Sequence, residues 1–286
     1  MNRKIHFTRF GITAVLMALA IGTIGFAAGP ARVVALGGDV TETIYALGQD
    51  KRLVCVDQTS LYPDAARKLP QVGYLRTLAA EGILSCKPDL ILASENAGPK
   101  AVLDQLAAAH IRIVRISGQE TPDAAAKKIT AVAEALGVTE TGLKLQKNFR
   151  NAMAQTRANI AKYKDAPRTV FLMAHGPGGA MAAGTGTAAD AMLKLAHADN
   201  AATGFAGYKP LTAESAVSLA PDVIVIDDIS LKSLGGLAAF RARPEIALTP
   251  AARNNRIVSV DTMYILGFGP RTPAAITTLA GAIHHK

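Results

Sequence analysis

Tryptophan is absent from this 286-residue chain, and aromatic residues make up only 5% of it. The basic residues, which give a formal net charge of +9, are scattered and are not interleaved with aromatic side chains. Nucleic-acid-binding surfaces usually combine clustered Lys and Arg with aromatic stacking residues, so nucleic acid is disfavoured as a partner. The net positive charge remains compatible with an anionic small ligand.

The sequence also lacks the motifs of common enzyme classes. It contains no GxSxG motif, no HExxH motif and no cluster of His, Asp and Glu typical of a hydrolytic metal centre. The loop Gly184-Thr-Gly-Thr187 has neither GxGxxG spacing nor a P-loop lysine, so a nucleotide site is not expected. We therefore predict that the chain is not an enzyme. The alternatives from another class, an exported α/β hydrolase or a surface adhesion protein, are disfavoured by the same absences.

Cysteine is scarce, with only Cys55 and Cys86 in the whole chain. Their wide spacing excludes a CxxC-type metal or redox site. An exported protein can form a disulfide, but Cys55 falls in a predicted buried strand, where a free cysteine behaves as a small apolar residue. Two unpaired cysteines are the favoured interpretation, and the pairing stays open.

One apolar run stands out, from Gly11 to Phe26, with three basic residues before it and small residues after it. This is the layout of a secretory signal peptide, and the run is shorter than the ~20 residues of a membrane-spanning helix. No cysteine lies near its end, so a lipoprotein anchor is not expected. We predict a signal peptide over 1–28, cleaved near Ala27 or Ala28, and a periplasmic mature protein.

The rest of the chain alternates short β-branched runs with helical patterns. Strands are expected at Arg32–Leu36, Leu53–Val56, Leu90–Ala93, Arg112–Ile116, Thr169–Met173, Val223–Ile226 and Ile257–Val260. Helices are expected between them, for example at Thr41–Leu47, Lys100–Ala109 and Asp123–Leu136. Strands without two-residue alternation, separated by helices, indicate parallel sheets covered on both faces, and hence a doubly wound α/β fold.

A segment over 139–165 breaks this rhythm. It is rich in strong helix formers, with apolar residues at helical spacing. A repeat flanks it: Leu78-Ala-Ala-Glu81 through Pro88-Asp89 recurs as Leu211-Thr-Ala-Glu214 through Pro221-Asp222, at a constant offset of 133 residues. Each copy reads as a short helix, a Pro-Asp corner and a buried strand.

One such unit on each side of a long helix predicts two similar Rossmann-like lobes joined by that helix. The predicted domains are an N-terminal α/β lobe over 29–138, a linking helix over 139–165 and a C-terminal α/β lobe over 166–286. A continuous helical linker is expected to permit only small rocking of the lobes.

The mature chain resembles the helix-linked periplasmic binding proteins that serve siderophore, cobalamin and haem ABC importers. The resemblance rests on the segment from Arg32 to Gly48, the two Glu…Pro-Asp units and the central helix. Within this class the chain is similar to the haem-binding, HmuT/ShuT-like branch. The motifs that carry this similarity are Val72-Gly-Tyr74-Leu-Arg-Thr-Leu-Ala-Ala-Glu-Gly-Ile-Leu84, Ala182-Ala-Gly-Thr-Gly-Thr187 and Leu266-Gly-Phe-Gly-Pro-Arg271.

The resemblance implies capture of haem b in the cleft between the lobes, with Tyr74 as an axial ligand of the ferric iron. Coordination favours the anionic phenolate, and tyrosinate ligation of haem is chemically established. His175 follows a predicted strand of the second lobe and is a candidate second ligand. The other candidate haem contacts are Tyr208 and the basic residues Arg76, Lys209 and Arg271, whose cations would bind propionates.

The resemblance further implies that Glu81 and Glu214, the equivalent acids of the repeat, dock on the permease dimer of an inner-membrane importer. An acid in the first turn of a helix is also favoured by the helix dipole, so both interpretations hold together. The expected binding protein is a monomer. The alternative within the same class is an iron-siderophore or cobalamin binding protein, which would differ mainly around Tyr74.

Overall fold

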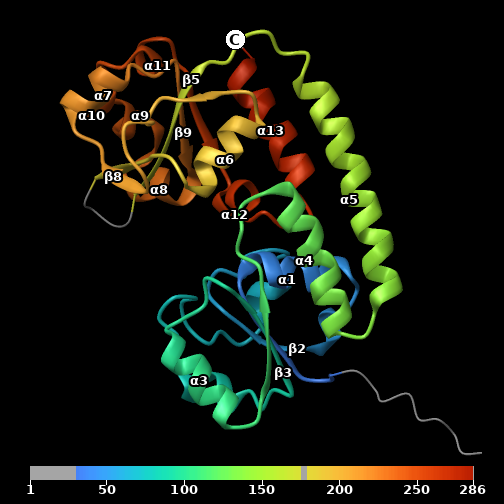
Figure 1. Cartoon of the computed structure of the whole chain (residues 1–286). Coiled ribbons are helices and arrows are strands. Elements are labelled where there is room, and N and C mark those ends of the chain that lie inside the picture. The colour runs from blue at the N-terminus through green and yellow to red at the C-terminus, as the bar shows by residue number, and fades with distance from the viewer. Residues whose placement is uncertain (1–29, 175–178, 286) are drawn as a thin grey trace, which may run out of the picture.

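The computed structural model describes residues 30–174 and 179–285. Figure 1 shows two α/β lobes, with the long helix α5 (Thr139–Ile160) running alongside both. The predicted signal peptide over 1–28 lies outside the described residues. Within the described residues, no helix has the length and hydropathy needed to span a membrane.

The N-terminal lobe is built on a four-stranded parallel sheet in the order β2-β1-β3-β4. Its strands are β1 (Val33–Leu36), β2 (Leu53–Val56), β3 (Leu90–Ser94) and β4 (Arg112–Ile116). Its helices are α1 (Gly38–Ala46), α2 (Ala80–Ser85), α3 (Lys100–Ala108) and α4 (Pro122–Ala135). The central strands β1 and β3 are buried along their whole length, because apolar clusters cover both faces of the sheet.

The C-terminal lobe has a six-stranded mixed sheet, in the order β10-β9-β5-β6-β8 with β7 paired to β5. Its strands are β5 (Arg168–Ala174), β6 (Ala180–Ala183), β7 (Asp199–Asn200), β8 (Tyr208–Pro210), β9 (Val223–Asp227) and β10 (Ile257–Val260). Its helices are α6 (Ala188–Leu195), α7 (Ala213–Leu219), α8 (Asp228–Ser233), α9 (Gly236–Arg241), α10 (Pro244–Ala247), α11 (Pro250–Arg253), α12 (Thr262–Leu266) and α13 (Thr272–His284).

Helix α5 has 22 residues and connects the lobes, as predicted. It packs closely on α4, where a Cβ added at Gly142 would lie 2.3 Å from Cβ of Ala133. Helix α4 in turn contributes to both lobes. Its first half, with Ile129, belongs to the apolar core of the C-terminal lobe, and its second half, with Val132, belongs to that of the N-terminal lobe. Helices α4 and α5 therefore join the lobes, and α4 contributes apolar side chains to the core of each.

The predicted fold class is confirmed, and all seven predicted strands are present within a residue or two. Two features differ from expectation. The strands β6 and β8 run antiparallel to their neighbours, and their short polar or alanine-rich sequences carry no β-branched signal. Cys55 and Cys86 form a disulfide. The expectation of two unpaired cysteines is therefore wrong. Cys55 is buried in its strand, but the end of α2 packs beside it and brings Cys86 within bonding distance.

Candidate ligand-binding site

A cleft of about 630 Å³ lies between the two lobes. This volume is in the range of sites for small molecules and cofactors. The N-terminal lobe lines it with residues that follow three parallel strands, namely Asp39 after β1, Asn96 after β3 and Glu120 after β4. Ligands of such sheets bind beyond the carboxyl ends of the strands, so the cleft lies where the topology predicts a site.

A buried aspartate shapes the loop at the end of β1. The carboxylate of Asp57 accepts a hydrogen bond from the backbone N–H of Gly37 at 2.8 Å, and it also accepts one from the Thr59 hydroxyl at 2.6 Å. Thr59 then accepts from the N–H of Gly38 at 3.0 Å. Because these bonds fix the backbone where α1 begins, the cleft wall at Gly38 and Asp39 is preorganised.

Tyrosines from both lobes line the cleft. Tyr74 lies on the loop before α2 and is 43% exposed. Tyr208 begins β8 in the other lobe and is half-buried. The repeat relates the two residues with a one-residue shift, so the lobes bring corresponding phenols to one site.

Charged side chains surround Tyr208. Burial raises the pKa of its hydroxyl, and the nearby carboxylates of Glu120 and Asp227 raise this pKa further, whereas Arg76 lowers it. Burial also raises the pKa of the Glu120 carboxyl, against the opposing effects of Arg76 and Lys128. Arg76 and Glu120 of one lobe thus influence the pKa of Tyr208 of the other lobe across the cleft.

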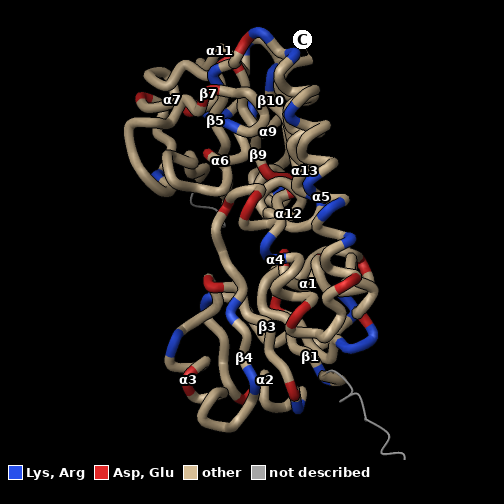
Figure 2. The backbone as a smooth tube through the Cα atoms, turned by 45° about the vertical axis from the view of Figure 1, so that its right-hand side comes forward, with Lys and Arg blue, Asp and Glu red and all other residues tan. Residues whose placement is uncertain are grey.

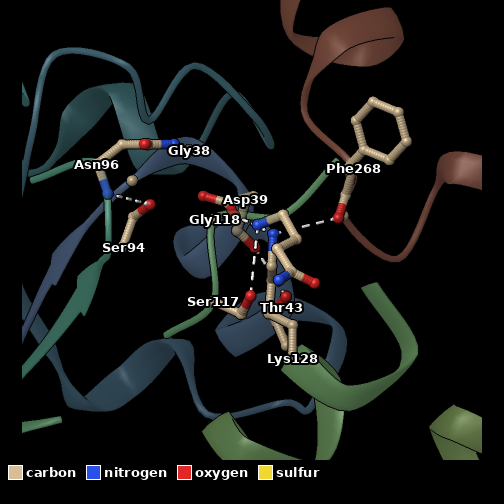
Figure 3. Close-up of polar contacts among 12 residues, drawn as sticks. Gly38, Asp39, Thr43, Ser94, Asn96, Ser117, Gly118, Lys128 and Phe268 are labelled. Atoms are coloured by element: carbon tan, nitrogen blue, oxygen red, sulfur yellow. Dashed lines mark hydrogen bonds and ion pairs between the residues drawn. The ribbon is translucent and has the colours of Figure 1, made fainter. Parts of the chain in front are cut away.

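Lys128 is the most buried of the charged residues that line the cleft, with 2% of its surface exposed. Its ammonium group forms an ion pair with Asp39, and it donates a hydrogen bond to the carbonyl oxygen of Phe268 at 3.2 Å (Figure 3). Asp39 and Lys128 belong to the N-terminal lobe, whereas Phe268 belongs to the C-terminal lobe. The bond therefore ties the lobes together at the base of the cleft.

Apolar side chains from the C-terminal lobe provide a further wall of the cleft. This wall contains three methionines, Met173, Met181 and Met263. Leu266 and Phe268 also belong to it. Thioethers are flexible and polarisable and fit well against flat aromatic surfaces. The site therefore combines apolar contact area with a small number of charged and phenolic groups, as ligand pockets commonly do.

Only some of the predicted site residues line the cleft. Tyr74, Arg76 and Tyr208 come together in the cleft. Lys209 is outside the cleft lining, with its ammonium group 5.2 Å from the centre of the Phe205 ring. His175 lies outside the described residues.

Arg271 is also outside the cleft lining. Its guanidinium binds Glu42 and stacks on the ring of Tyr62, 3.4 Å from the ring centre. Glu81 and Glu214 are exposed on α2 and α7, and neither belongs to the cleft lining.

Sequence reasoning missed Asp39, Glu120 and Lys128. A signal existed for Lys128, since it occupies the apolar face of a predicted helix, one position before Ile129 and four before Val132. A lysine on such a face is buried only when a partner neutralises it. Nothing in the spacing of Glu120 distinguished it from a surface acid.

The family comparison matches a model described as periplasmic binding protein over residues 33–264. Among solved structures, the chain is similar to the periplasmic heme-binding protein RhuT from Roseiflexus sp. RS-1 in apo form. The identity is 38%, the TM-score is 0.86, and the match covers 90% of this chain and 98% of that chain. It is also similar to the periplasmic heme-binding protein BhuT in complex with two hemes, with 42% identity, a TM-score of 0.84 and coverage of 88% and 97%.

Curated relatives point to the same class. An uncharacterized ABC transporter substrate-binding lipoprotein of Bacillus subtilis, YvrC, is 29% identical over 89% of this chain and 80% of its own length. The vitamin B12-binding protein of Pectobacterium carotovorum is 40% identical, but only over 33% of this chain and 34% of its own length. The similarity to heme-binding proteins therefore extends over both lobes, whereas that to the vitamin B12-binding protein covers a third of the chain.

Proposed function

Because the chain belongs to the periplasmic binding protein family, we propose that it captures haem in the cleft between its lobes and delivers it to an ABC importer. This family comprises extracytoplasmic, non-enzymatic binding proteins for transport. The observation that carries the choice of ligand is Tyr74, a phenol exposed at the cleft in a chain that resembles heme-binding proteins over both lobes.

In this proposal the Tyr74 oxygen ligates the ferric iron as a phenolate, which is a hard anionic donor suited to Fe(III). Arg76, two residues further on the same cleft-lining loop, stabilises the negative charge of the phenolate or of a propionate. The methionines and Phe268 contact the macrocycle, and Tyr208 contacts the haem from the opposite lobe. His175 and Lys209 remain candidate contacts beside this set.

Delivery requires a second surface. We infer that the exposed Glu81 and Glu214 bind basic residues of an inner-membrane permease dimer, one glutamate for each subunit. The mature protein, released from its leader near Ala27 or Ala28, acts as a monomer in the periplasm. The partial similarity to a vitamin B12-binding protein keeps cobalamin as the alternative ligand.

Titration of the mature protein with hemin tests the ligand. We expect a Soret band with a high-spin charge-transfer feature typical of phenolate ligation, and loss of that feature in Tyr74→Phe. Tyr62→Phe is a matched control, because Tyr62 is 44% exposed and lies outside the cleft lining. A spectrum unchanged in Tyr74→Phe would refute the axial ligand, and binding of cobalamin without any response to hemin would refute haem as the cargo.

A further inference from the structure

The helices α2 and α7 present matching surfaces on the two lobes. At the repeat offset of 133 residues, Glu81 corresponds to Glu214 and Leu84 corresponds to Val217. The exposure pattern also corresponds, since both acids are exposed, the residues two positions later are buried, and Leu84 and Val217 are exposed again. Each helix therefore displays an acid and, one turn further, an apolar side chain on the same face.

The backbone around the two helices is held in the same way. The Arg32 guanidinium donates to the carbonyl oxygen of Cys86 at 2.7 Å. The Arg168 guanidinium donates to that of Leu219, the residue equivalent to Cys86, at 2.9 Å. Both helices end beside a residue in the left-handed region, Lys87 with φ of 48° and Ala220 with φ of 41°, again 133 residues apart.

The Pro-Asp corners complete this equivalence. Asp89 accepts a hydrogen bond from the backbone N–H of Arg32 at 3.1 Å, and Asp222 accepts one from the backbone N–H of Arg168 at 3.1 Å. Figure 2 shows α7 on the lobe at the top and α2 on the lobe at the bottom. The two lobes thus carry equivalent surfaces on equivalent supports.

Each helix also has a constraint of its own. The disulfide joins Cys86 at the end of α2 to Cys55 on β2. Helix α7 has no disulfide, but it begins with a capping box in which Thr212 and Ser215 bond reciprocally. The disulfide therefore tethers the end of α2 to the sheet, whereas the capping box stabilises the first turn of α7.

The displayed groups have no partner within the described part of the chain. Neither Glu81 nor Glu214 forms a salt bridge there. Leu84 is 36% exposed and Val217 is 51% exposed, which places both among the few large exposed apolar residues of the described chain. On each helix, the acid and the apolar side chain are therefore available to contact the same partner molecule.

We propose that Leu84 and Val217 form the apolar half of a two-point docking surface for a twofold-symmetric partner, each subunit of which presents a basic side chain beside an apolar depression. This proposal rests on the proposed delivery to a permease dimer and adds Leu84 and Val217 to the acids. The pseudo-twofold repeat argues for a symmetric partner, since two equivalent surfaces match two equivalent sites. Two acids unpaired within the described chain argue for basic groups on it.

The two halves of each surface have distinct roles. The acids are exposed, so their attraction to a basic partner is screened by salt. Burial of Leu84 and Val217 is not screened in this way, because it depends on the removal of apolar surface from water. At high salt, the residual affinity therefore depends mainly on the apolar pair.

The test measures binding of the haem-loaded protein to its importer in lipid nanodiscs, at low and at high salt. We expect Leu84→Ser with Val217→Ser to weaken binding on the order of tenfold at both salt concentrations. Glu81→Gln with Glu214→Gln is expected to weaken binding mainly at low salt. Leu143→Ser is the control, because Leu143 is a 47% exposed apolar residue on α5, outside the repeat.

The possible outcomes separate this inference from the proposed function. If the wild-type protein binds hemin and the importer, but Leu84→Ser with Val217→Ser binds the importer as Leu143→Ser does, the apolar surface is refuted and the delivery function stands. If the wild-type protein does not bind the importer at all, the delivery function itself is refuted. An unchanged hemin titration of the double variant confirms that its fold and cleft are intact.

Discussion

Arg271 of the C-terminal lobe binds Glu42 of the N-terminal lobe through three hydrogen bonds. Its Nε and Nη2 donate to Oε2 at 2.9 and 2.8 Å, and its backbone N–H donates to Oε1 at 2.9 Å. The side chains are only 25% and 9% exposed. Together with the bond from Lys128 to Phe268, this ion pair gives the lobes polar connections that α5 alone does not provide.

Removal of one partner of this pair is expected to destabilise the protein substantially. We predict that Glu42→Gln lowers the free energy of unfolding by about 2–4 kcal/mol, because it leaves a largely buried guanidinium without a counter-ion. Urea denaturation followed by circular dichroism measures the effect. Arg271→Lys serves as a second variant, since lysine retains the charge but neither the paired hydrogen bonds nor the stacking on Tyr62.

The same variants test the role of Arg271 at the cleft. If its guanidinium acts only between the lobes, Arg271→Lys changes the stability but leaves the hemin affinity within about twofold. A residue that does not contact the ligand contributes little to the binding free energy. A loss of hemin affinity tenfold or more, with stability intact, would instead support propionate binding by Arg271.

Much of the fold could be predicted from the sequence, because the local patterns of strands and helices agree with the topology of the folded protein. Strands such as β3 and β9 are continuous apolar runs, and each follows a Pro-Asp corner that fixes where it begins. The repeat then predicted two lobes without any knowledge of their contacts. Strands β6 and β8 were missed because their pairing is set by neighbouring strands and not by their own composition.

The site was predictable only in part. Tyr74 was singled out because its motif resembles that of haem-binding proteins, and Tyr208 lies at the corresponding place in the second half of the chain, with a one-residue shift. The positions of Arg271 and Lys128 depend on contacts between residues 229 and 140 positions apart in the sequence. A single sequence contains no periodicity that reports such distant pairs, so an arginine near a glycine-rich loop could not be assigned to Glu42 rather than to a ligand.

Glu120 is expected to make hemin binding depend on pH. Burial raises the pKa of its carboxyl, so the group becomes anionic only as the pH rises through that elevated value. Above this value the carboxylate repels the propionates, and below it the repulsion disappears. We therefore predict that Glu120→Gln binds hemin a few-fold more tightly than the wild-type protein at pH 7–8.

Comparison of the two proteins across the pH range isolates this effect from other titrating groups, including Tyr208 and the iron ligand. Their hemin affinities should converge as the pH falls below the elevated pKa of Glu120. A difference that stays constant from pH 4 to pH 8 would show that the carboxyl acts by shape or hydrogen bonding and not by charge.

The disulfide between Cys55 and Cys86 closes a loop with a sequence separation of 31 residues. For a loop of this length, the chain-entropy model gives about 3.7 kcal/mol of stabilisation. We predict a loss of this order in Cys55→Ala with Cys86→Ala. Added reductant should lower the stability of the wild-type protein to that of the double variant and leave the variant itself unchanged.

Asp190 is expected to contribute stability that depends on pH in the acid range. Its carboxylate is buried, which by itself would raise its pKa, but hydrogen bonds from Lys194 at 2.8 Å, Asn200 at 3.0 Å and the N–H of Gly186 at 3.2 Å outweigh this effect and lower the pKa. A carboxyl with a lowered pKa stabilises the folded state above its unfolded pKa of ~3.9, and this contribution is lost as the pH falls through the lower folded value. Asp190→Asn should therefore lose about 1–3 kcal/mol at pH 7.

This loss should shrink below about pH 4, because the wild-type carboxyl is then protonated in the unfolded state and increasingly in the folded state. Asp123→Asn is the control: ion pairs with Lys127 and Arg150 also lower the pKa of Asp123, but these pairs are exposed on α4 and α5, so solvent screens them and only a small loss is expected. Thermal unfolding of the three proteins between pH 3 and pH 8 measures the difference. A pH-independent deficit in Asp190→Asn would show that Asp190 supports the Gly186 loop at the cleft through hydrogen-bond geometry alone, without a contribution from its charge.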